Sequence, residues 1–154
     1  MSQVRVACRK VMDKAQHVKI DKEAISGCLI SYNTEPEPWE AFEFHYTGPK
    51  IIDYIFTLDS LNFCFWPHSN YDYPDLARNL KVILQNNPLG LSPLTLSNFS
   101  IDNLLQIFPS DFPDLEVRLN KVNELGRVTV EKFDGSFENI LLRCDNSGLK
   151  VIQT

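Results

Sequence analysis

A chain of 154 residues has the size of one ordinary domain with a single hydrophobic core. Its 44% of hydrophobic and 23% of charged residues are typical of soluble globular proteins, and they exclude a disordered tail, a collagen-like fibre and a membrane protein. The net charge of −5 argues against duplex DNA or intact RNA as a direct partner, because nucleic acids bind basic surfaces.

Helical patterns dominate the chain, and we predict a mainly α fold with one domain over residues 1–154. Two prolines indicate a loop at residues 33–39, and alternating aromatic side chains predict at most a short extended segment near residues 41–46. Helices are predicted over about residues 4–16, 21–30, 72–87, 100–108 and 114–125, and the last four begin at residue types that cap helix N-termini: Asp21, Asp72 (or Pro74-Asp75), Ser100 and Asp114.

A further helix should begin at Gly48-Pro49 and run to about Trp66, where Pro67 ends it. Beyond Gly126 both strand and helix stay open, because residues 128–130 are β-branched. A turn at residues 134–136 precedes a helix over about residues 137–144, and residues 149–154 begin one more element. That ending has two interpretations, a frayed terminus or the front portion of a longer protein.

Eleven of the 17 aromatic residues fall between Trp39 and Tyr73, which on frequency alone indicates an aromatic core. Four residues of the predicted helix are spaced i, i+3, i+4 and i+7 and should share one side of it: Asp59, Asn62, Phe63 and Trp66. Apolar residues nearly surround this helix, so we expect it in the interior, where a carboxylate and an amide need partners. The two polar groups either cap nearby backbone or form a pocket wall for the N–H donors of a guanine-like base.

Other classes of site lack their sequence patterns. The histidines at 17, 45 and 68 are dispersed, and the four cysteines form no Cys-x-x-Cys pair, so we expect no metal and free thiols in a reducing compartment. Motifs of α/β-hydrolases, Rossmann proteins and P-loop proteins are absent, and we expect no cofactor. Without a signal peptide or a membrane span, the sequence predicts a cytoplasmic protein with no membrane partner.

The motif from Leu58 to Trp66, preceded by His45-Tyr46 and Gly48, resembles the D-x-L-N-F-x-F-W motif of the queuosine salvage proteins. Later segments around Tyr73 and over residues 131–137 are similar to that family in the same order. The resemblance implies a helical fold related to helix-hairpin-helix DNA glycosylases, with helix rather than strand over residues 127–133. It also implies hydrolysis of the N-glycosidic bond of queuosine 5′-phosphate, which releases queuine for tRNA queuosine salvage.

By this resemblance, recognition of the base and ribose falls to five residues: His45, Asp59, Asn62, Phe63 and Trp66. The catalytic residues are unknown, because the family's catalytic acid and phosphate-binding basic residue are expected in a further helical half. We therefore expect the N-terminal portion of a salvage protein, incomplete at its C-terminus, that binds queuosine 5′-phosphate or queuine. A second chain could supply the other half. The alternatives are a non-catalytic small-molecule binding or assembly module and a helical interaction protein whose aromatic residues form only its core.

Overall fold

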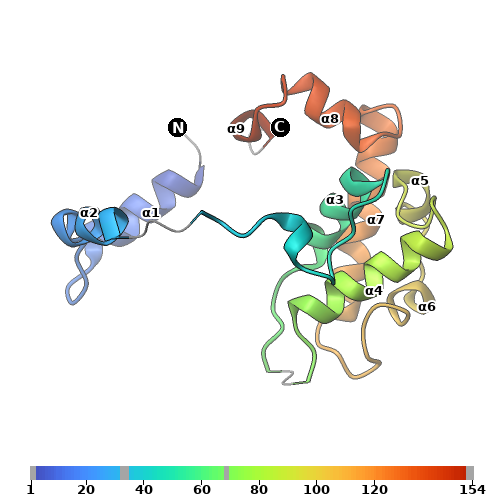
Figure 1. Ribbon diagram of the computed structural model, residues 1–154, viewed down its shortest axis with the longest axis horizontal. Coiled ribbons are helices and arrows are strands. Elements are labelled where there is room, and N and C mark those ends of the chain that lie inside the picture. Colours follow the sequence, from blue (N-terminus) through green and yellow to red (C-terminus); the bar gives the residue numbers. More distant parts are fainter. Residues whose placement is uncertain (1–2, 32–34, 68–69, 152–154) are drawn as a thin grey trace. The chain divides into compact units, whose positions relative to one another are not determined.

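The computed structural model describes residues 3–31, 35–67 and 70–151 (Figure 1). Contacts divide the chain into two compact units, one up to Glu37 and the other from Pro38 onward. The first unit contains α1 (Gln3–Lys14) and α2 (Lys22–Ser31). The side chain of Asp21 accepts hydrogen bonds from the backbone N–H of Glu23 at 3.0 Å and of Ala24 at 2.9 Å, which confirms the predicted cap of α2.

The second unit is also helical, and no strand occurs in the described ranges, which confirms the mainly α prediction. Near residues 41–46, where at most a short extended segment was predicted, one turn of 3-10 helix over Trp39–Ala41 leads through Phe42, which has extended dihedral angles, into further turns. The elements of the second unit are η1 (Trp39–Ala41), α3 (Ile51–Leu61), α4 (Tyr73–Asn86), α5 (Pro93–Leu96), α6 (Ile101–Leu104), α7 (Leu115–Lys132), α8 (Phe137–Arg143) and α9 (Gly148–Val151).

Local capping chemistry sets where α4 and α6 begin. Asp72 and Asp75 exchange side-chain and backbone hydrogen bonds in a capping box at the start of α4, and Ser100 and Asn103 do the same for α6. Helix α7 continues without interruption to Lys132, so the β-branched residues after Gly126 are helical, as the family resemblance implied. None of the helices in the described part is both long and apolar enough to cross a membrane.

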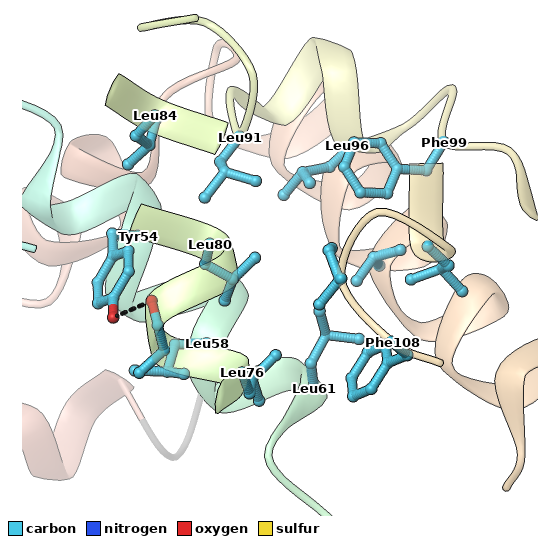
Figure 2. Close-up of a cluster of buried hydrophobic side chains, with 14 of the residues drawn as sticks. Tyr54, Leu58, Leu61, Leu76, Leu80, Leu84, Leu91, Leu96, Phe99 and Phe108 are labelled. Atoms are coloured by element: carbon cyan, nitrogen blue, oxygen red, sulfur yellow. Dashed lines mark hydrogen bonds between the residues drawn. The ribbon is translucent and has the colours of Figure 1, made fainter. Parts of the chain in front are cut away.

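One hydrophobic core holds the second unit together (Figure 2). Its members include Leu58 and Leu61 of α3, Leu80 of α4 and Leu96 of α5, all at most 1% exposed. The hydroxyl of the buried Tyr54 donates to the backbone oxygen of Ala77 at 2.9 Å, the bond drawn as a dashed line in Figure 2, and so ties α3 to α4. This core fixes α3, α4 and α7, which carry the predicted site residues or their neighbours.

Helices α5 and α7 approach each other at Gly126. A Cβ atom built on Gly126 would lie 2.3 Å from the backbone nitrogen of Ser97 and 2.6 Å from the backbone oxygen of Pro93. Only glycine therefore allows this backbone contact. Helix α5 has four residues and was not predicted from the sequence. The local pattern that indicates its start is a serine cap followed by proline, Ser92-Pro93.

Candidate functional site

Helix α3 ends at Leu61 and not near Trp66, so the predicted common helical face is wrong. Asn62 leaves the helical conformation at φ −81° and ψ 69°, and Cys64 adopts the left-handed region at φ 48°. The physical reason is non-local: the guanidinium of Arg118, on α7, donates to the carbonyl oxygen of Leu61, where α3 ends. Only Asp59 of the four residues lies on the helix, and the other three follow in a loop.

The expected burial of Asp59 and Asn62 is also wrong, because both are exposed. The buried carboxylate of α3 is that of Asp53, whose residue is only 7% exposed. Although Asp59 is exposed as a residue, the surrounding protein removes part of the hydration of its carboxylate and raises its pKa. Within the described residues neither the carboxylate of Asp59 nor the side-chain amide of Asn62 makes a hydrogen bond, so both keep these polar groups for a ligand or for water.

His45 is a buried, hydrogen-bonded histidine. Its Nδ1 lies 3.1 Å from the carbonyl oxygen of Trp39, and its Nε2 lies 2.9 Å from the hydroxyl of Tyr73. Because a carbonyl oxygen only accepts, Nδ1 carries the proton, and in the neutral ring Nε2 accepts from the tyrosine hydroxyl. The indole of Trp39 stacks on the imidazole with ring centroids 3.5 Å apart and planes 8° apart, which fixes the ring orientation.

Tyr73, the first residue of α4, connects His45 to the neighbourhood of Asp59. Burial raises the pKa of Tyr73, and the negative charge of Asp59 raises it further. The hydroxyl hydrogen is directed to His45, which leaves the tyrosine oxygen able to accept. The structure therefore joins Tyr73 to His45 by a hydrogen bond and couples Tyr73 electrostatically to Asp59, and Tyr73 had not been predicted as a site residue.

Phe63 and Trp66 differ in what their rings can offer. The guanidinium of Arg118 lies 4.2 Å from the centre of the half-buried ring of Phe63, so that ring face is already covered. Trp66 is 87% exposed, so its ring is available for stacking. A cavity of about 270 Å³ lies elsewhere, lined by residues that include Asn79, Phe99 and Gln106. No group of three or more potential metal-binding side chains occurs among the residues that the structure describes.

The arrangement suits recognition better than bond cleavage. Two exposed polar groups and one exposed indole lie at or just after the end of α3. Such a set can accept N–H donors and stack on a flat ring. Residues 42–154 match the family model described as queuosine salvage protein. The chain belongs to the queuosine salvage protein family.

Several relatives carry the name queuosine 5′-phosphate N-glycosylase/hydrolase. The protein from Dictyostelium discoideum is 32% identical over 166 residues, which cover 97% of this chain and 52% of that relative. The protein from Sphaerobacter thermophilus is 27% identical, with 97% and 51% covered, and that from Mus musculus is 26% identical, with 97% and 52% covered. The chain thus spans about half the length of the curated relatives it matches. The predicted membership of the queuosine salvage family is confirmed.

Two residues that shape this part of the salvage-family fold were not predicted from the sequence. Tyr73 lies in a segment that had been noted for its family resemblance, and that was the available signal. Arg118 gave no signal, because an arginine in an amphipathic helix is ordinarily a solvated surface residue, yet here it is fully buried. Three of its four carbonyl partners lie at the end of α3 or just after it, more than 50 residues earlier in the chain.

Proposed function

We propose that this chain supplies base recognition for hydrolysis of the N-glycosidic bond of queuosine 5′-phosphate, the reaction that releases queuine for tRNA queuosine salvage. The observation that carries the proposal is the Asp59 carboxylate: it lies in the family motif, is partly desolvated, and has no hydrogen-bond partner within the described residues. The names of the relatives supply the substrate and the reaction.

The chemistry of the base fits these side chains. Queuine is a 7-deazaguanine, and its guanine-type edge presents adjacent N–H donors that a carboxylate accepts well. Asp59 is the proposed acceptor for this edge, and Asn62, three residues later in the chain, offers both a donor and an acceptor. The exposed ring of Trp66 would stack on the flat base, and Phe63 would contribute an edge or its second face. His45 would act through Tyr73, to which it is hydrogen bonded.

Bond cleavage needs groups beyond recognition. An N-glycosidic bond breaks through an oxocarbenium-like sugar, which a carboxylate stabilises while water attacks. Because this chain spans about half of its relatives, we place the catalytic acid and the phosphate site in the other half, from the same or a second chain. We also propose that the fold is related to that of the helix-hairpin-helix DNA glycosylases and that the protein is cytoplasmic.

The test compares binding with turnover for the purified chain. Calorimetry with queuosine 5′-phosphate and with queuine should show saturable binding, and chromatography should detect little or no release of queuine. Absence of binding by both ligands would refute base recognition. Release of queuine at an ordinary enzymatic rate would show that the catalytic acid is among the residues present and would refute the division between halves.

A non-catalytic small-molecule binding or assembly module is the second candidate, and it is favoured by side chains at the end of α3 that suit hydrogen bonding and stacking. Addition of the remaining half of a relative, produced as a separate protein, distinguishes the two. A base-recognition half should restore release of queuine in that mixture, whereas a purely non-catalytic module should not.

A further inference from the structure

Among the described residues, the charged side chain that is fully buried is that of Arg118, at 0% exposure. It pairs with no carboxylate there; all its hydrogen bonds go to backbone carbonyl oxygens. The two terminal nitrogens donate to Leu61, to Phe63 and, at 3.1 Å, to Cys64, while Nε donates to Pro113 at 3.3 Å. One guanidinium therefore satisfies three carbonyl oxygens at the end of α3 and in the segment that follows it.

Aromatic rings complete the surroundings of this cation. The guanidinium carbon lies 4.2 Å from the ring centre of Phe63, 4.8 Å from that of Phe112 and 4.9 Å from that of Phe108, with Phe65 at 5.8 Å. Ring faces attract cations and replace part of the lost hydration. Burial lowers the pKa of Arg118, but a guanidinium stays protonated in proteins. The residue is thus a permanent buried charge held by carbonyl dipoles and rings.

These contacts determine the path of the recognition loop, which we define as residues 62–66. The carbonyl groups at 61, 63 and 64 turn inward to the guanidinium, while the side chains of Asn62 and Cys64 are exposed. Trp66, two residues beyond the last of these bonds, is 87% exposed. Removal of the guanidinium would leave buried carbonyl oxygens unsatisfied, so the loop would have to change its path to hydrate them.

We propose that Arg118 is the positioning residue of the recognition loop: by holding the carbonyl groups of residues 61, 63 and 64, it sets the presentation of Asn62 and Trp66 to the base without touching the ligand. This inference rests on the proposed function for its ligand, but its structural part stands on the hydrogen bonds alone. Lysine cannot replace arginine here, because a single ammonium group lacks the planar fork that reaches carbonyl oxygens on several sides.

The first experiment needs no ligand. Chymotrypsin cleaves after aromatic residues, and under native conditions it should cut R118K after Phe63 or Phe65 at least about tenfold faster than the wild-type chain, as a loosened loop opens more often. Arg143→Lys is the matched control, because Arg143 also lies over a ring, that of Phe133 at 5.1 Å, but is exposed. A second control, Leu80→Val, destabilises the core without touching the loop. Equal cleavage rates in R118K and the wild type would overturn the proposal.

The second experiment measures affinity for queuine and queuosine 5′-phosphate by calorimetry, at a temperature where circular dichroism shows every variant folded. R118K should bind at least about tenfold more weakly, whereas R143K and L80V should bind as the wild type does. Affinity loss in L80V equal to that in R118K would show a merely structural role and overturn positioning. If the wild type binds neither ligand, the proposed function fails, while the cleavage result still decides whether Arg118 holds the loop.

A measurement on the unaltered chain covers the case in which R118K does not fold. The Nε–H proton of Arg118 should exchange with solvent far more slowly in NMR spectra than that of the exposed Arg78. Exchange of both protons at the same rate would contradict a buried guanidinium bound to the loop and would overturn the proposal.

Discussion

Replacement of Gly126 by alanine sets two opposing effects of similar size against each other. In a free helix, alanine is more favourable than glycine by about 1 kcal/mol. At Gly126, however, the new Cβ would lie 2.3 Å from the backbone nitrogen of Ser97, 2.6 Å from the backbone oxygen of Pro93 and 2.8 Å from the carbonyl carbon of Leu96. Backbone atoms cannot rotate away as a side chain can.

Relief of this clash requires α5 and α7 to separate by about 1 Å, the difference between these distances and ordinary van der Waals contact. Such overpacking costs about 1–3 kcal/mol in cores, and the separation also weakens the contacts of the fully buried Leu96. We expect the clash to exceed the gain in helix propensity, so that Gly126→Ala lowers the free energy of unfolding by about 1–2 kcal/mol.

Urea denaturation followed by circular dichroism measures this change. Gly148→Ala is the matched control, because nothing lies within 4 Å of a Cβ built there. It should leave the free energy of unfolding unchanged or raise it by up to about 1 kcal/mol. If Gly126→Ala is as stable as the wild-type chain, the close approach of α5 and α7 does not limit stability, and the reasoning fails.

Three further predictions concern α3. Tyr54→Phe should lower the free energy of unfolding by about 1 kcal/mol in urea denaturation, because it removes the hydrogen bond to Ala77; an unchanged value would show that this bond contributes nothing. Burial raises the pKa of Asp53 in the folded chain above its unfolded value of about 3.9, so stability is lost as pH rises through the folded pKa. The stability of Asp53→Asn relative to the wild type should therefore increase from about pH 3.5 to pH 7, and a constant difference would contradict the raised pKa. Asp59→Asn should weaken binding of queuosine 5′-phosphate at least about tenfold in calorimetry, and unchanged affinity in a folded variant would reject Asp59 as the base acceptor.

Local chemistry made much of this fold predictable from the sequence. The caps at Asp21, Asp72 and Ser100 depend on residues one to three positions away, and each lies where the sequence placed it. The course of α7 past Gly126 followed from family resemblance and not from residue propensity, which left strand and helix open. Helix α5 was missed because four residues carry too little periodicity to reveal an element.

The site itself was harder to predict, because its geometry depends on contacts between distant parts of the chain. The apolar pattern suggested a helix up to Trp66, but the bond from Arg118 to Leu61 joins residues 57 positions apart. The same pattern suggested a buried Asp59, yet the side of α3 that enters the core carries Tyr54, Leu58 and Leu61. Side-chain spacing indicated which residues belong to the motif, and tertiary contacts decided which of them reach solvent.

The contrast between the two tryptophans gives the molecule a built-in optical reporter. Trp39 is stacked against an imidazole and tied through its indole N–H to the backbone oxygen of Tyr46, at 2.9 Å, whereas Trp66 stands almost wholly in water. Any molecule that covers the second indole should shift its emission to shorter wavelength and shield it from dissolved iodide, while the first indole changes little. Binding of a ligand at Trp66 can therefore be followed in real time by the intrinsic fluorescence of the protein, without attaching a dye.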